Sequence, residues 1–169
     1  MLKAVLLLTG LVFAVAVIAP GMLTRATTDA PGKTEQPVLA NVQPDHGGLV
    51  RLTADRSGHY RTEAEINNRT VPVLVDTGAT LIALRYEDAR SMNLVNPGDK
   101  FDVRVRTANG EGRAKRITLR SVTVGTITLR DVDALVSEQG VLATNLLGMS
   151  FLKRLARFEV QRGQLVLER

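Results

Sequence analysis

One short stretch of this chain has residues that could carry out acid–base chemistry. It opens with an acidic residue directly after residues 71–75, an apolar run of strand length. Its members are Asp76, Thr77, Gly78, Ala79 and Thr80. Removing a carboxylate from water costs several kcal/mol unless hydrogen bonds or a function compensate. Asp76 is therefore predicted to be a functional carboxylate. The alternative is an Asx-type turn, in which Asp76 and Thr77 bond only the nearby backbone.

The composition of the chain argues against several other chemistries. Its 169 residues include no cysteine, which rules out disulfides, thiolate metal sites and a cysteine nucleophile. The two histidines, His46 and His59, are isolated, and no His-Glu-x-x-His zinc pattern occurs. Residues 148–152 lack the last glycine of a nucleophile elbow, so Ser150 is expected only to cap a local helix end. The sequence thus predicts no metal and no cofactor.

Charged residues are scattered along the chain and form no block. The 22 Lys and Arg outnumber the 17 Asp and Glu, which gives a formal net charge of +5. Many basic residues alternate with apolar ones, as in residues 103–106, and this alternation is typical of the solvent face of an antiparallel strand. Because neither a basic block nor interleaved aromatic residues occur, we expect no binding to nucleic acid.

The N-terminal part of the chain differs in composition from the rest. Residues 4–23 contain no charge, and a helix of that length covers about 30 Å, the thickness of a bilayer's hydrocarbon core. A cleavable signal peptide, with small residues at 14–16, is the alternative, but the length of the apolar run favours an uncleaved anchor. We therefore expect residues 1–23 to be a membrane anchor or signal segment and residues 24–48 to be a flexible linker. The anchor would be a single pass in the inner (cytoplasmic) membrane, with the remaining domain on the periplasmic or extracytoplasmic side.

Residues 49–169 have the pattern of one small all-β domain. Asn67 and Asn68 predict a tight hairpin turn, because asparagine tolerates positive φ. Short helices are expected at 86–92 and 149–155. The predicted strands are 49–53, 60–66, 71–75, 101–106, 117–119, 122–124, 127–129, 132–136, 158–160 and 165–167. Val, Leu and Ile dominate, and a meander of such strands predicts a small closed barrel.

Two further motifs lie downstream of Asp76. Residues 105–114 predict a hairpin, because Asn-Gly is a strong turn signal. Its tip consists of Thr107, Ala108, Asn109, Gly110, Glu111 and Gly112. An apolar pair that ends in glycine follows, and its members are Leu146, Leu147 and Gly148.

Taken in this order, the motifs resemble those of the retropepsin-like, single-lobed (clan AA) aspartic proteases. The likeness rests on residues 76–80 after an apolar strand, on the hairpin at 105–114 and on the apolar pair before Gly148. Gly58-His59-Tyr60 and residues 147–152 make the chain similar to a bacterial membrane-anchored group of these proteins. The resemblance covers residues 49–167 and implies an all-β retropepsin-type barrel with one or two short helices.

The resemblance implies a role for each residue near Asp76. Asp76 would be the catalytic carboxylate, Thr77 would hydrogen-bond across a pair of aspartates, and Thr80 would orient the outer oxygen of Asp76. Gly78 would let two backbones approach closely, and Ala79 completes this supporting loop. The alternative for both hydroxyls is a local turn bond.

The two downstream motifs would contact the substrate. Residues 105–114 would form a flap over an extended peptide, unless they are an ordinary surface hairpin. Leu146, Leu147 and Gly148 would line a substrate pocket, although such an apolar pair is more often part of the core. Asn93 stands where relatives often carry glycine, and asparagine tolerates the same left-handed conformation.

The expected function follows from the number of these motifs. An aspartic protease needs two carboxylates that share one proton and titrate together. The chain contains one Asp-Thr-Gly and no Asp-Ser-Gly, so the second carboxylate must come from a second copy, in a homodimer. The sequence thus predicts an aspartic endopeptidase that hydrolyses extended polypeptide segments. One alternative is a non-catalytic peptide-binding or assembly module on the same membrane-tethered fold. Another is a domain that only spaces a partner from the membrane.

Overall fold

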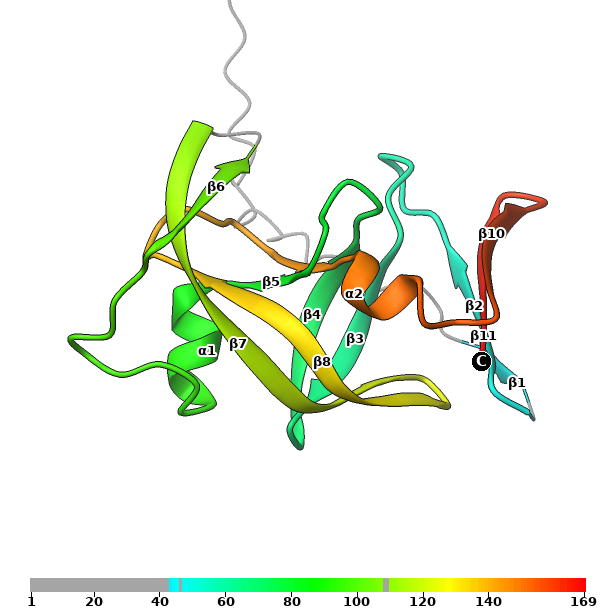
Figure 1. The fold of residues 1–169 in the computed structure, drawn as a ribbon. Helices are drawn as coiled ribbons and strands as arrows, with labels where there is room; N and C mark the ends of the chain where they lie inside the picture. Colours follow the sequence, from blue (N-terminus) through cyan, green and yellow to red (C-terminus); the bar gives the residue numbers. More distant parts are fainter. Residues whose placement is uncertain (1–42, 46, 108–109) are drawn as a thin grey trace, which may run out of the picture. The chain divides into compact units, whose positions relative to one another are not determined.

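The computed structural model describes residues 43–45, 47–107 and 110–169 (Figure 1). The described residues form strands and two short helices. These are β1 (Gln43–Asp45), β2 (Leu49–Thr53), β3 (Arg61–Ile66), β4 (Arg69–Val75), β5 (Ile82–Leu84), α1 (Tyr86–Ser91), β6 (Val103–Thr107), β7 (Gly110–Val124), β8 (Ile127–Ser137), β9 (Asn145–Leu147), α2 (Met149–Leu152), β10 (Arg157–Gln161) and β11 (Gln164–Glu168).

Six strands close into a barrel. The larger sheet has the order β3-β4-β9-β5-β8-β7-β6, and β3 also pairs with β7. The closing pairs are Glu65 with Thr123 and Ile66 with Val122. Strand β6 lies outside this ring and pairs only with the far end of β7. The predicted all-β closed barrel with two short helices is therefore confirmed.

The connectivity of the barrel differs from the predicted meander. Strands β4 and β9 run parallel, and so do β5 and β8. Parallel neighbours need long crossover connections, so these pairs join parts of the chain that are far apart in sequence. The alternation of apolar residues shows which face of a strand is buried but not which strand lies beside it.

The strands predicted at 117–119 and 122–124 are one strand, β7, and those at 127–129 and 132–136 are one strand, β8. Both strands bend together at Arg120 and Asp131, where the pairing is interrupted and Asp131 adopts a φ of 52°. The guanidinium of Arg154 donates hydrogen bonds to the carbonyls of Arg130 (2.8 Å) and Asp131 (3.1 Å). The alternation of buried and exposed side chains in β7 shifts by one residue across the bend, between Leu119 and Val122. In the sequence, such a shift looks like a break between two strands.

The turns follow the local chemistry of the sequence. Asn67 and Asn68 have φ values of 49° and 71° and join β3 to β4 in the predicted two-residue turn. Arg162 and Gly163, at 51° and 77°, do the same for β10 and β11. Asn93 has a φ of 55°, the left-handed conformation expected there.

A second sheet, with the order β1-β2-β11-β10, is entirely antiparallel. Strand β1 pairs with β2 although it lies within residues 24–48, the range predicted to be a linker. Side chains of β2 and β11 join the same hydrophobic core as the barrel. The largest fully buried side chains are those of Phe151, Leu52, Ile66, Ile82, Leu84, Leu119, Ile127, Leu147, Leu152, Leu167, Val50 and Val73. Apart from Phe151, these side chains are aliphatic, as the composition predicts.

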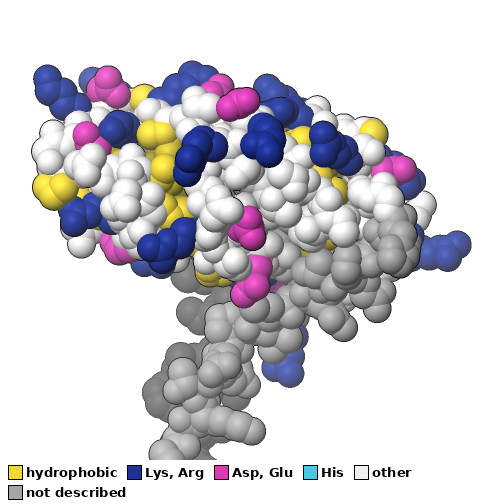
Figure 2. Space-filling model, turned by 90° about the horizontal axis from the view of Figure 1, so that it is seen from below, with side chains coloured by type: hydrophobic (Ala, Val, Ile, Leu, Met, Phe, Trp, Pro, Cys, Tyr) yellow, Lys and Arg dark blue, Asp and Glu magenta, His cyan; other side chains and the backbone are white. Residues whose placement is uncertain are grey.

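The predicted anchor, residues 1–23, lies outside the described residues. Among the helices of residues 43–45, 47–107 and 110–169, none has the length and apolar character needed to cross a bilayer. On the face of the domain shown in Figure 2, Lys and Arg side chains are interspersed with acidic and uncharged ones.

Three aspartates accept hydrogen bonds that stabilise their charged form. The backbone N–H of His59 and the guanidinium of Arg61 hold the pKa of Asp55 below its ordinary value. The pKa of Asp99 is lowered by the ammonium of Lys115, 2.8 Å away. The pKa of Asp133 is lowered in the same way by Arg116 at 2.8 Å.

These lowered pKa values predict acid sensitivity of the fold. A group with a lower pKa in the folded state stabilises the fold above its unfolded pKa of about 3.9, and this contribution is lost as pH falls through the folded pKa. The thermal midpoint of unfolding should therefore decrease as the pH is lowered below about 4. The variant Asp99→Asn should unfold at a lower temperature at pH 7 and show a shallower loss in acid. Asp102→Asn, at an exposed carboxylate, is the control, and equal pH dependence in both variants would contradict the assignment.

Candidate active site

The loop that begins with Asp76 lies where β4 ends beside β9. The parallel pairing of Val75 with Leu147 brings the ends of both strands together, and the N–H of Asp76 donates to the Leu147 carbonyl at 3.1 Å. Asp76 itself is half-buried. Its Oδ1 accepts a hydrogen bond of 2.8 Å from the N–H of Gly78, which is the bond of the predicted Asx-type turn. Within the described part of the chain, this N–H is the only donor to the carboxylate, so Oδ2 is open to a water, a substrate or a second carboxylate.

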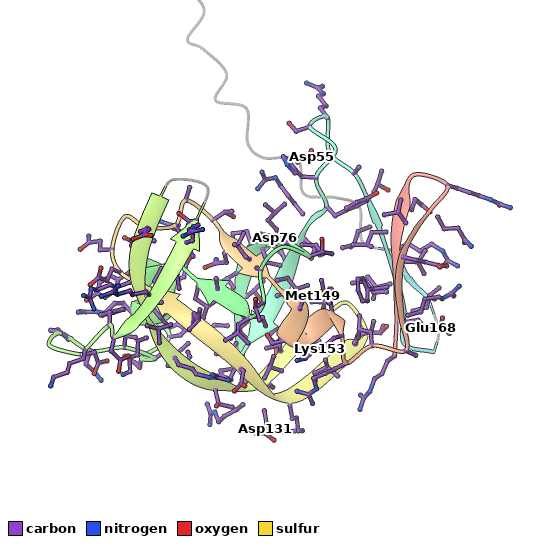
Figure 3. All side chains as sticks on the ribbon, turned by 45° about the horizontal axis from the view of Figure 1, so that its top comes forward. Asp55, Asp76, Asp131, Met149, Lys153 and Glu168 are labelled. Atoms are coloured by element: carbon purple, nitrogen blue, oxygen red, sulfur yellow. The ribbon has the colours of Figure 1, made fainter. Side chains whose placement is uncertain are left out.

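The start of α2 holds the other end of the loop. The N–H of Met149 donates to the Ala79 carbonyl at 2.8 Å. A Cβ atom at Gly148 would lie 2.2 Å from the Leu81 carbonyl oxygen and 2.6 Å from that of Ala79, so only glycine fits there. Figure 3 shows Asp76 in the loop beside the start of α2, where Met149 is labelled.

Ser150 contradicts the role predicted for it. The first turn of α2 has no side-chain cap, and the Ser150 hydroxyl instead accepts a buried hydrogen bond of 2.9 Å from the Ile82 N–H. Sequence reasoning missed this contact because its two partners are 68 residues apart. A serine two residues after Gly148 gives no sign of a distant partner.

Asn145 is a second residue whose importance the sequence did not reveal. It is 1% exposed, and its amide nitrogen donates to the Pro72 carbonyl and to Asp88 Oδ2, both at 2.9 Å. Its oxygen accepts from the Arg85 N–H, also at 2.9 Å. Asn145 thus joins β4, β9 and the start of α1. The only local signal is a polar residue directly before the apolar pair.

The two threonines of the loop are exposed, as is Gly78. Neither Thr77 nor Thr80 hydrogen-bonds to Asp76 within the described residues. Their expected roles, a bond across two aspartates for Thr77 and orientation of the outer oxygen for Thr80, therefore stay predictions. A Cβ at Gly78 would lie 3.1 Å from Asp76 Oδ1, so the absence of a side chain there keeps the carboxylate accessible.

The predicted flap is the hairpin formed by β6 and the start of β7. It pairs from Val103 with Ala114 to Thr107 with Gly110, and the Thr107 hydroxyl donates to the Gly110 carbonyl at 3.0 Å. Ala108 and Asn109 lie outside the described residues, as does His46. Glu111 forms an exposed ion pair with Arg106 at 3.8 Å.

The base of this hairpin rests on the loop after β8. A Cβ at Gly112 would lie 2.7 Å from Val141 Cγ1, and the Arg113 carbonyl accepts from the Glu138 N–H at 2.9 Å. The missing side chain at Gly112 thus lets the hairpin pack closely against Val141.

A row of half-buried apolar side chains crosses four strands beside Asp76. Leu74 of β4 pairs with Leu146 of β9, Leu146 with Ala83 of β5, and Ala83 with Leu135 of β8. The residues on either side of Ala83, Leu135 and Leu146 are buried, so the row lies on the face opposite the core. Of the four residues in this row, only Leu146 belongs to the predicted substrate pocket of Leu146, Leu147 and Gly148. Leu147 is fully buried in the core, the alternative that the sequence left open for the apolar pair.

Clusters of metal-binding side chains are not part of this site. Across residues 43–45, 47–107 and 110–169, no group of three or more His, Asp or Glu is placed to hold a metal ion. His59 is exposed in the loop before β3, where its carbonyl accepts from the Asp55 N–H at 2.7 Å.

Comparison with known proteins identifies the architecture. The family described as "gag-polyprotein putative aspartyl protease" matches residues 62–154, more than half of the chain. The crystal structure of a retropepsin-like aspartic protease from Rickettsia conorii is 36% identical, has a TM-score of 0.64 and aligns over 71% of this chain and 89% of its own. The barrel and the Asp76 loop thus define a retropepsin-like fold. The chain belongs to the retropepsin-like aspartyl protease family.

Two curated relatives are also similar. An uncharacterised protein from the cobV 5′ region of Sinorhizobium sp. is 40% identical over 133 residues, which is 78% of this chain. An uncharacterised protein of Rickettsia prowazekii (strain Madrid E) is 36% identical over 120 residues, or 71% of this chain. The chain spans 57% and 51% of the lengths of these two relatives.

The tight contact at Gly148 predicts that even one methyl group will disturb the site. In Gly148→Ala the backbone of the loop must shift, because the atoms in the way are carbonyl oxygens and not flexible side chains. Urea denaturation should show a loss of about 3 kcal/mol or more in the free energy of unfolding. The control is Gly163→Ala, where φ is 77° and space is open. Its cost should be only about 1 kcal/mol, and equal losses in the two variants would refute close packing at Gly148.

Proposed function

We propose that the chain is an aspartic endopeptidase that works as a homodimer. The observation that carries this proposal is the Asp76 carboxylate, half-buried, held by one backbone N–H and open at Oδ2 in a loop fixed by β9 and α2. Family membership supports the same chemistry. Two such carboxylates, one from each copy, would share a proton. The ionised one would take a proton from water as it attacks, and the protonated one would donate to the scissile carbonyl oxygen.

The need for a second copy follows from the content of the site. Each chain has one Asp-Thr-Gly sequence and therefore one carboxylate of this kind. A two-fold axis beside Asp76 would place the same residue of the second copy opposite it. The exposed positions of Thr77, Gly78 and Thr80 support this arrangement, because a partner can reach them.

The substrate we propose is an extended polypeptide with apolar side chains near the scissile bond. The row of Leu74, Leu146, Ala83 and Leu135 would receive such side chains, because burial of apolar surface is the main source of their affinity. The hairpin of β6 and β7 would cover the peptide and bond its backbone as an added strand.

We also propose the location expected from the sequence. The uncharged run at 4–23 supports a single-pass anchor in the inner membrane with the protease domain on the outer side. Tethering would raise the local concentration of chains and so favour the dimer.

Replacement of the proposed catalytic group should abolish turnover and keep the fold. Asp76→Asn has nearly the same shape and can still accept from Gly78, but it cannot serve as a base. We expect peptide hydrolysis, measured from pH 3 to pH 8, to fall by at least about a hundredfold with an unchanged circular dichroism spectrum. Asp131→Asn, at an exposed aspartate on the β8 bend, is the matched control and should keep full activity.

The same measurement separates the proposal from its alternative. A non-catalytic module would dimerise and bind peptide in both the wild type and Asp76→Asn, with no turnover at any pH. Equal cleavage by the wild type and Asp76→Asn would show that the activity comes from another group.

Shortening a side chain of the apolar row should change substrate preference. In Leu146→Ala, kcat/KM for peptides with a leucine or methionine beside the scissile bond should fall about tenfold, and peptides with alanine there should be affected less. The control is Val160→Ala, because Val160 is 61% exposed on β10 and is not a member of the row. If both variants and all peptides respond alike, the row does not contact the substrate.

A further inference from the structure

Ser150 is a buried polar residue for which the proposed reaction has no direct use. It is 5% exposed, and its hydroxyl accepts the Ile82 N–H at 2.9 Å. Ile82 is itself fully buried at the start of β5, directly after the loop that begins at Asp76. Without the hydroxyl, this N–H would lose its acceptor in an apolar environment, which is costly.

The loop is tied to β9 and α2 by three hydrogen bonds. At its start the Asp76 N–H donates to Leu147, and in its middle the Ala79 carbonyl accepts from Met149. Both of these join backbone atoms, so they do not depend on which side chains are present. The third bond, at the end of the loop, depends on the single hydroxyl of Ser150.

The opposite side of the loop offers much less support. Thr77, Gly78 and Thr80 are exposed, and among the described residues the carboxylate of Asp76 is hydrogen-bonded only by the Gly78 N–H. The position of the carboxylate is therefore set mainly from the side of β9 and α2. A shift at Ile82 would be transmitted through the short segment 77–81 to the Gly78 N–H that orients the carboxylate.

We propose that Ser150 is a positioning residue for Asp76. Its hydroxyl fixes the end of the loop and thereby sets the distance and angle between the two carboxylates of the dimer. This inference rests on the proposed peptidase function for its kinetic consequence. Its structural consequence, the coupling of Ser150 to the bond between Gly78 and Asp76, does not depend on that function.

The test uses a matched pair of variants in the full chain. Ser150→Thr keeps the hydroxyl, and Ser150→Val has nearly the same shape without it. Ser150→Ala removes the hydroxyl without adding volume, in case the extra methyl group is not tolerated. Thr123→Val is the control for loss of a part-buried hydroxyl elsewhere, because among the described residues the Thr123 hydroxyl bonds only that of Thr128, at 2.9 Å, where β7 meets β8.

We expect Ser150→Val and Ser150→Ala to lower kcat by about tenfold to a hundredfold, because small errors in the placement of catalytic groups have effects of this size. KM should change by less than about twofold, since the apolar row is intact. The pH profile of kcat/KM should also shift, because the shared proton depends on the geometry of the two carboxylates. Ser150→Thr should keep kcat and the pH profile of the wild type.

A purely structural role predicts a different result. Ser150→Val and Ser150→Ala would then lower the thermal midpoint of unfolding as Thr123→Val does. The value of kcat per folded molecule and the pH profile would stay unchanged. This outcome would overturn the proposal. Amide NMR shifts test it without activity. Positioning predicts that Ser150→Ala moves the signals of both Ile82 and Gly78, whereas movement of Ile82 alone would refute it. An inactive wild type would remove the peptidase function and leave this second test valid.

Discussion

The structure depends on one set of hydrogen bonds, those between the segment 145–150 and the segment 72–85. The donors and acceptors of the shorter segment belong to Asn145, Leu147, Met149 and Ser150. Their partners in the longer segment extend from Pro72, before Asp76, to Arg85, directly after β5. The two backbones touch where Gly148 leaves no space for a side chain. The irregular loop that carries the Asp76 carboxylate is thus bonded to β9 and α2 at its start, in its middle and at its end. The proposed catalysis would need its groups to be positioned in this way.

The rest of the fold is arranged around this contact. The parallel pairing of β4 with β9 and of β5 with β8 brings the four strands together, and the closure of β3 on β7 buries the aliphatic core behind them. Because each strand buries alternate residues, the same pairing exposes the apolar row that starts at Leu74 on the opposite face. Strand β7 continues past the coupled bend at Arg120 and Asp131 and forms the hairpin with β6 at its far end. The Asp76 loop, the apolar row and the hairpin are therefore consequences of one strand arrangement.

Local features of this architecture could be predicted from the sequence, and long-range ones could not. Asn67-Asn68, Asn93 and the alternation around Val103 each determine their own backbone conformation or exposed face, so their predictions are confirmed. The resemblance located the Asp76 loop, because its motif is short and contiguous. Ser150 and Asn145 were missed because their partners are 57 to 73 residues away, and no local pattern encodes a distant partner. The long strands β7 and β8 were divided in two because a change of buried face looks like a break.

The separation between the two bonded segments also governs when the site can form. Its side-chain contacts close loops of 60, 68 and 73 residues, so they carry a large chain-entropy cost and belong to the slow, non-local part of folding. During synthesis from the N-terminus, the loop at Asp76 leaves the ribosome long before Ser150 does. A nascent chain therefore has the carboxylate but not its geometry, and the site is completed only when nearly the whole domain has been made.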